Sequence, residues 1–215
     1  MRDAYHESLD AVTDELVTMS RLVGSMMQRA SVALLEADRA RAEAVIAADD
    51  EVDAACQELE LQTTELIALQ QPVATDLRIV LSAMRMSSTL ERMGDLAQHV
   101  AKSARMRYPD CAVPEPLRPQ FTEMAAVADR MAAKMGDVIA SKDLDLAREI
   151  ESDDDRMDAL HREVLDVLLR QPGSTPIGEA VDITLLNRYY ERFADHAVNI
   201  ARRTIYLVIG ERADA

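Results

Sequence analysis

Hydrophobic residues recur at spacings of three and four positions along the whole chain. This spacing matches the turn of an α helix, and the chain contains no run of the alternating pattern that marks a half-buried strand. Each apolar stripe therefore predicts an amphipathic helix with one face on a core. We expect an all-α protein.

Residues that cap or interrupt helices divide this pattern into six segments. Asp38 is placed to cap the second helix and Asp143 to cap the fifth. Pro72 marks a tight turn after the second helix, and Thr175 is the expected N-cap of a sixth helix that has Pro176 at its first position. The predicted helices cover about 5–36, 38–70, 73–106, 120–141, 143–170 and 176–210.

The segment 107–119 separates the third predicted helix from the fourth. A proline inside a helix removes a hydrogen bond and clashes with the preceding turn, so we expect this segment to be a non-helical linker. It would join a three-helix unit at 1–106 to another at 120–215. Its prolines are Pro109, Pro114, Pro116 and Pro119.

The two halves of the chain repeat one another. An Asp-x-x-x-Asp pair at 49–53 recurs 105 positions later at 154–158. A Glu-Arg-x-x-Asp-x-Ala motif at 91–97 recurs 100 positions later at 191–197. Two matches at nearly the same offset indicate a tandem duplication. The fold prediction is therefore two tandem three-helix bundles.

The duplication creates four pairs of carboxylates, each spaced by four residues. Residues at this spacing lie on one face of a helix. Two like charges there destabilise the helix by a few tenths of a kcal/mol. A bound cation would offset that repulsion. The pairs are Asp49/Asp53, Glu91/Asp95, Asp154/Asp158 and Glu191/Asp195.

The pairs within one half are also at matching heights. A short turn at Pro72 makes the second and third helices antiparallel, and Asp53 and Glu91 are nearly equally far from it along the chain. The second half repeats this arrangement around a longer loop, which absorbs a mismatch of two residues. At about 1.5 Å per residue, four carboxylates come level in each hairpin. Their angular positions around the helices predict a surface site.

We therefore predict that all eight carboxylates are metal ligands. Oxygen ligands favour hard ions such as Mg²⁺, Mn²⁺, Ca²⁺ or Fe³⁺. Zn²⁺ bound by carboxylates is also compatible, whereas a tetrahedral Cys/His zinc site is not encoded.

The histidines and one cysteine have weaker interpretations. His161 follows Asp158 by three residues, a spacing seen in ferritin-like di-iron bundles, but Cys56 occupies its equivalent position in the first half. We interpret Cys56 as a small core residue. His196 is expected to be a solvated surface residue, and His99 is a further candidate ligand of the first cluster.

Composition narrows the functional classes. The 215 residues are 48% hydrophobic but only 3% aromatic, without Trp, so the core must be aliphatic and Met-rich. A net charge of −15 argues against nucleic-acid binding. No apolar run is long enough to span a membrane, and the N-terminus lacks an apolar signal core. We expect a cytoplasmic protein without a catalytic nucleophile–base pair, and so not an enzyme.

Two longer motifs resemble the PhoU family of phosphate-signalling proteins. They are Leu90-Glu91-Arg92-Met93-Gly94-Asp95 and the segment 188–201, RYYERFADHAVNIA. The duplicated six-helix layout agrees as well. The sequence departs from the family pattern at Leu96 and His99, where His and Asn are usual, and at Ala194, which replaces a Gly. The departures at Leu96 and His99 concern the first metal site.

The resemblance implies a function that the residues alone do not. Its members carry surface metal clusters on the acidic pairs and restrain the phosphate-starvation response. The implied partners are the ATPase subunit of the phosphate ABC transporter, the phosphate-sensing histidine kinase and a second copy of the chain. Two alternatives stay open: a carboxylate-bridged di-iron metalloenzyme or metal store, and a helical adaptor that binds no metal.

Overall fold

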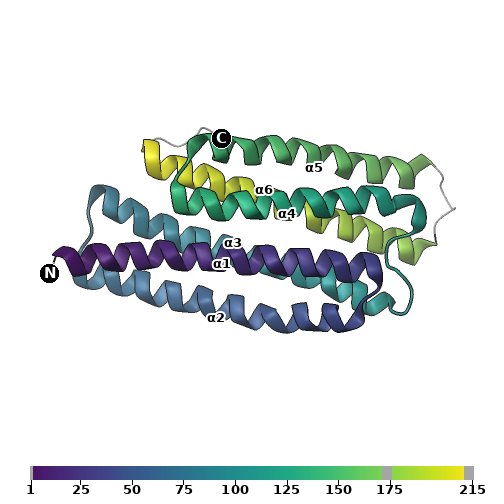
Figure 1. The fold of residues 1–215 in the computed structure, drawn as a ribbon, viewed down its shortest axis with the longest axis horizontal. Coiled ribbons are helices and arrows are strands. Elements are labelled where there is room, and N and C mark those ends of the chain that lie inside the picture. Colours follow the sequence, from purple (N-terminus) through teal and green to yellow (C-terminus); the bar gives the residue numbers. More distant parts are fainter. Residues whose placement is uncertain (1, 171–175, 211–215) are drawn as a thin grey trace.

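The structure is a computed structural model that describes residues 2–170 and 176–210, with side chains from residue 5 onward. This part of the chain is helical and contains no strand (Figure 1), so the all-α prediction is confirmed. The elements are α1 (Arg2–Glu36), α2 (Arg39–Gln70), α3 (Ala74–Arg107), a 3₁₀ turn η1 (Glu115–Leu117), α4 (Arg118–Ser141), α5 (Leu144–Arg170) and α6 (Ile177–Ile209).

Both predicted aspartate caps are confirmed. The carboxylate of Asp38 accepts a hydrogen bond from the backbone N–H of Arg41 at 3.0 Å. The carboxylate of Asp143 accepts bonds from the N–H groups of Asp145 and Leu146 at 2.8 and 3.2 Å. These bonds satisfy N–H groups that the first turn of a helix leaves without a partner.

The prediction that all of 107–119 is non-helical was wrong at its ends. Arg107 is the last residue of α3, and η1 occupies Glu115–Leu117. Helix α4 already begins at Arg118 and has Pro119 in its first turn. The first turn tolerates proline because its N–H groups have no partner within the helix.

The start of the last helix also differs from the prediction. Pro176 is not the first helical residue, because it is extended, with ψ 141°, and α6 begins at Ile177. Its carbonyl still accepts the bond from the N–H of Ala180 at 3.0 Å. Thr175 lies outside the described residues. At the other end, Gly210 takes the left-handed conformation, with φ 82°, that often ends a helix.

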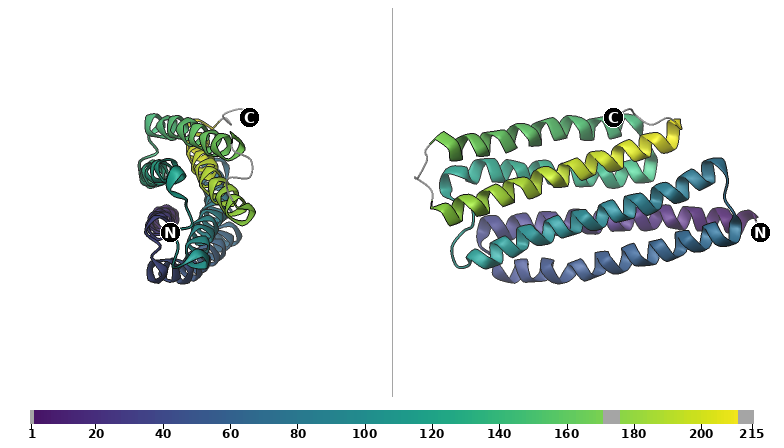
Figure 2. Two further views of the ribbon diagram at one scale, coloured as in Figure 1. Left: turned by 90° about the vertical axis from the view of Figure 1, so that its right-hand side faces the viewer. Right: turned by 180° about the vertical axis from the view of Figure 1, so that it is seen from behind.

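The six helices form two bundles that share one core. α1, α2 and α3 pack together, as do α4, α5 and α6, while α1 packs on α4 and α3 on α6. Figure 2 shows α3 and α6 side by side, with α2 and α5 on the outside. Arg107, at the end of α3, forms an ion pair with Asp182 near the start of α6, so these two helices are antiparallel.

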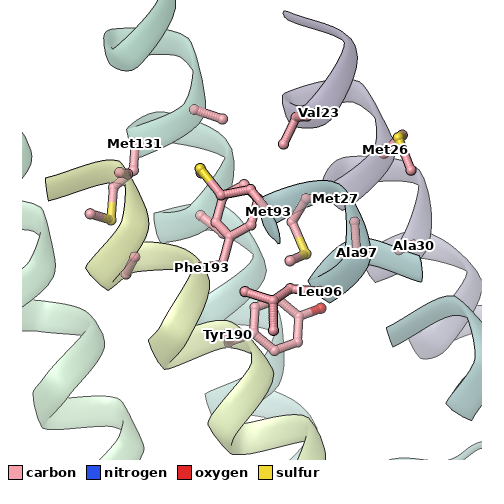
Figure 3. Packing of buried hydrophobic residues seen from close by; sticks show 14 of the residues in the cluster. Val23, Met26, Met27, Ala30, Met93, Leu96, Ala97, Met131, Tyr190 and Phe193 are labelled. Atoms are coloured by element: carbon pink, nitrogen blue, oxygen red, sulfur yellow. The ribbon is translucent and has the colours of Figure 1, made fainter. Parts of the chain in front are cut away.

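The contact between the halves, α1 with α4 and α3 with α6, is called here the central interface. Gly24 lets α1 approach α4 closely, because an added Cβ there would lie 3.0 Å from the Cβ of Ala132. Met27, Met93 and Phe193 meet at its centre and are fully buried (Figure 3). The predicted aliphatic and Met core is present, together with the buried aromatic residues Phe121, Tyr190 and Phe193.

Among the described residues, no helix combines the length and the apolar character needed to cross a membrane.

Candidate metal centres

One contact between facing side chains fixes the register of the first hairpin, α2 against α3. The hydroxyl of Ser87 donates to the sulfur of Cys56 at 3.2 Å. Cys56 lies three residues after Asp53, and Ser87 lies four residues before Glu91, so Asp53 and Glu91 are at nearly the same height. One helical turn further from the loop, the same spacing brings the other two carboxylates level. The predicted register is confirmed.

The second hairpin, α5 against α6, has the same register. The amide nitrogen of Asn187 donates to the backbone carbonyl of His161 at 3.0 Å. His161 lies three residues after Asp158, and Asn187 lies four residues before Glu191, as at the equivalent positions of the first hairpin. The loop 171–175 lies outside the described residues, but the helices that it joins repeat the geometry of the first half.

The four carboxylates of the first hairpin act on one another electrostatically. Burial raises the pKa of Asp49 above its usual range, and the charges of Asp95 and Asp53 raise it further. Burial also raises the pKa of Glu91, and Asp95, Asp53 and Asp49 contribute to that shift. Lys102 partly opposes the effect at Asp49. A cluster that holds this much negative charge suits a cation.

The second hairpin shows a larger effect at Asp154. Burial raises the pKa of this carboxyl from 3.8 to about 6, and the charges of Asp158, Asp195, Asp155 and Glu191 add to the shift. A carboxyl with this pKa is protonated in a fraction of the molecules near neutral pH, unless a nearby positive charge lowers its pKa.

Glu191 combines burial with an open oxygen. Burial is the largest cause that raises its pKa, and the charge of Asp195 is the next, while Arg188 and His161 lower it. Arg188 forms an ion pair with Oε1 of Glu191. The other oxygen, Oε2, is buried and has no hydrogen-bond partner within the described part of the chain.

The expected surface position holds for only part of the set. Asp53, Asp158 and Asp195 are exposed, but Asp49 has only 7% of its surface exposed. Asp49 is covered because α3 approaches α2 closely at Gly94. An added Cβ there would lie 3.4 Å from a carboxylate oxygen of Asp49. The other four, Glu91, Asp95, Asp154 and Glu191, are half-buried.

The donor chemistry fits a metal ion, because every predicted ligand is a carboxylate and one buried oxygen is free. However, within residues 5–170 and 176–210 no group of three or more His, Cys, Asp or Glu side chains is arranged to hold an ion. The carboxylates share a level without converging on one point. Binding would therefore have to draw their side chains together, and metal ligation stays a prediction.

His99 makes a contact that the sequence did not predict, and His196 differs from its interpretation as a solvated residue. His99 is exposed and stacks on Tyr189 of α6, with ring centroids 5.2 Å apart, so its ring contacts the other half of the chain. His196 is half-buried instead of solvated. Burial lowers its pKa, with a further contribution from Arg192. Its Nε2 atom is buried and has no hydrogen-bond partner in residues 5–170 and 176–210. Packing of α3 on α6 explains both.

Sequence reasoning missed a groove beside the first cluster. Cys56 is half-buried, packs against the core and lines this groove, which has a volume of about 460 Å³. Its residues repeat at spacings of three and four on the facing helices, a signal that was present in the sequence. They are Asp53, Cys56, Gln57 and Glu60 on α2, and Met84, Ser87, Ser88 and Glu91 on α3.

Known proteins resemble this chain over nearly its full length. The family model of the PhoU domain matches the chain twice, at residues 16–104 and 121–204. The phosphate-specific transport system accessory protein PhoU homolog 2 of Mycobacterium tuberculosis is 44% identical over 210 residues, which cover 98% of this chain and 99% of that protein.

Solved structures agree with this match. The crystal structure of the phosphate transport system regulatory protein PhoU from Streptococcus pneumoniae superposes with a TM-score of 0.85 at 27% identity, covering 98% of this chain and 100% of that one. The structure of PhoU from Pseudomonas aeruginosa also gives 0.85, at 28% identity and over 96% of this chain and 100% of that one. With two matches of the domain model and a full-length relative at this identity, the chain belongs to the PhoU family.

Proposed function

We propose that the protein is a metal-binding regulatory adaptor that restrains phosphate uptake and phosphate-starvation signalling. The observation that carries this proposal is the shared register of the two hairpins, which brings four carboxylates level in each half. The names of its relatives, an accessory protein and a regulatory protein of phosphate transport, support the role in phosphate transport. No catalytic role is proposed.

The carboxylates of two neighbouring helices would bind the same cation and so bridge the helices. In the first hairpin, Asp49 and Asp53 of α2 would hold a cation together with Glu91 and Asp95 of α3. In the second, α5 and α6 would do the same with Asp154, Asp158, Glu191 and Asp195. A bound cation would supply the positive charge that these sets lack. The raised pKa values of Asp49 and Asp154 mark the electrostatic cost that would be relieved.

The acidic surface would then serve for partner binding in the cytoplasm. We propose the ATPase subunit of the phosphate ABC transporter and the phosphate-sensing histidine kinase as partners, and a second copy of the chain as a homodimer partner. Electrostatic complementarity raises association rates and selects partners. A chain with net charge −15 would therefore favour basic patches on them.

A pull-down from phosphate-replete cells tests the proposal. The wild-type chain should recover the transporter ATPase and the kinase, and neutralising one hairpin should reduce that recovery. A control neutralises four exposed carboxylates of α1 and α4 and so removes equal charge. The test variant is Asp49→Asn, Asp53→Asn, Glu91→Gln and Asp95→Asn; the control is Asp10→Asn, Asp14→Asn, Asp129→Asn and Asp137→Asn.

The outcomes separate the parts of this proposal. Recovery of neither partner by the wild-type chain contradicts the regulatory role. Equal loss in the test and control variants contradicts a specific role of the hairpin. Elemental analysis of protein purified without added ions tests metal binding itself. Oxygen consumption on loading with ferrous iron would instead favour the di-iron enzyme.

A further inference from the structure

Three polar atoms on the facing helices α5 and α6 are buried and unpaired within the described residues. They are Nδ1 of His161, Oδ1 of Asn187 and Oε2 of Glu191, and none has a hydrogen-bond partner among the residues that the structure describes. Asn187 has 0% of its surface exposed. Its amide nitrogen donates to the carbonyl of His161, so the atom left open is the oxygen. Buried polar atoms are normally paired, so this group points to a missing ligand.

The three side chains lie at one level of the hairpin. Asn187 and Glu191 are four residues apart on α6 and so share one face. His161 contacts Asn187 through its backbone, and its imidazole is close enough for its charge to act on Glu191. Arg188 occupies Oε1 of Glu191 and leaves Oε2 available. Two oxygens and one nitrogen therefore come from facing helices.

At the equivalent position of the first hairpin, the two facing side chains bond directly to each other. Cys56 and Ser87 stand at the positions equivalent to His161 and Asn187, and the Ser87 hydroxyl donates directly to the Cys56 sulfur. Ser87 and Glu91, whose side chains are both described, have no buried oxygen left open. The two halves thus differ at this level in a way that the duplication alone does not explain.

We propose that the second hairpin binds one divalent transition-metal ion through His161 Nδ1, the Glu191 carboxylate and the Asn187 amide oxygen. Imidazole nitrogen suits Zn²⁺, Co²⁺, Ni²⁺ and Fe²⁺, whereas Mg²⁺ and Ca²⁺ take oxygen ligands. The first hairpin has no such nitrogen at this position, so the two halves prefer different classes of metal. The inference rests on the proposed metal-binding function and adds a nitrogen ligand to its second site.

Nuclear magnetic resonance of the imidazole nitrogens tests the ligand directly. The chain has four histidines, so each can be followed in the ¹⁵N-labelled full-length protein. One equivalent of Zn²⁺ added to chelator-treated protein should move the Nδ1 resonance of His161 to the metal-bound range. His161→Asn identifies that resonance by its absence. A resonance of His161 that Zn²⁺ leaves in place overturns the proposal and is the result expected if a water molecule joins the three atoms.

Affinity measurements supply the second readout. His161→Asn should weaken Co²⁺ binding at least tenfold, because a ligand is lost, and should leave Mn²⁺ binding at the first hairpin within twofold. Cys56→Ser is the matched control, since it changes the equivalent position, and should leave Co²⁺ affinity within twofold. Equal Co²⁺ affinity in wild type and His161→Asn, or an equal loss in Cys56→Ser, overturns the proposal.

These outcomes are independent of the pull-down. A protein that binds Mn²⁺ but whose His161 resonance Zn²⁺ leaves in place would refute the nitrogen ligand and leave the carboxylate clusters intact. A moved His161 resonance together with failure to recover either partner would support the site and contradict the regulatory role.

Discussion

Replacing Asp154 with its neutral isostere Asn tests the electrostatic account of the clusters quantitatively. The pKa of this carboxyl rises from 3.8 to about 6, a shift of about two units, and each unit corresponds to about 1.4 kcal/mol. The full shift would cost about 3 kcal/mol. Asp154 is only half-buried, so solvent screening reduces the expected cost to about 1 to 1.5 kcal/mol.

The sign of the effect follows from the direction of the shift. The folded protein holds the Asp154 proton to higher pH than the unfolded chain, whose carboxyl ionises near 3.8. The free energy of unfolding therefore falls as the pH rises from 3.8 to about 6, and the loss is complete above that range. Asp154→Asn has no proton to lose, so it should be more stable than wild type at neutral pH.

Thermal unfolding in the presence of a chelator measures this difference. At pH 7.5 Asp154→Asn should melt about 2 to 6 °C above wild type, since 1 kcal/mol corresponds to about 2–4 °C in a chain of this size. At pH 5 the gain in unfolding free energy should be smaller, because the folded protein still holds part of the Asp154 proton there. Asp137→Asn, an exposed site on α4, is the control and should change the melting temperature little. A variant no more stable than wild type at pH 7.5, or equally stabilised at both pH values, would refute the reasoning.

Three further predictions concern metal, packing and hydrogen bonding, each measured by thermal unfolding. Excess Co²⁺ should raise the melting temperature of wild type more than that of Asp154→Asn; equal rises would argue against this carboxylate as a ligand. Gly94→Val should cost about 2 kcal/mol, because even a Cβ at Gly94 would lie 3.3 Å from a methyl of Val52; an unchanged melting temperature would contradict that tight contact. Tyr190→Phe should lower the free energy of unfolding by about 1 kcal/mol, because it removes the 2.7 Å hydrogen bond to Ser31. In a Ser31→Ala background, where that bond is already absent, Tyr190→Phe should cost less, and an equal cost would show that the bond is not the cause.

The fold was largely predictable because local signals agree with one another. Asp38 and Asp143 cap helices as expected, since a cap depends on residues within one turn. Pro119 was misinterpreted because proline both interrupts helices and suits their first turn, and the sequence around it does not decide between the two. For the same reason the predicted start of the last helix, Pro176, was one residue before its actual start at Ile177.

The level of the site residues along each hairpin was predictable from the sequence, but their burial was not. Register follows from the distances along the chain to the turn, so the equal height of Asp53 and Glu91 could be derived from the sequence alone. The burial of Asp49 depends on how closely α3 packs at Gly94. The half-buried state of His196 depends on the packing of α3 on α6. Such contacts join segments far apart in the chain, and helical periodicity carries no information about them.

The peripheral position of α2 and α5 has a consequence for how the molecule opens. Each packs mainly against helices of its own half, while the central interface is built from the other four (Figure 1). Either outer helix can therefore detach without separating the two halves, and amide hydrogen exchange should be fastest there. Both acidic sets bridge a helix that can detach to one that remains packed. An ion held between them would thus govern how often the outer helix swings free.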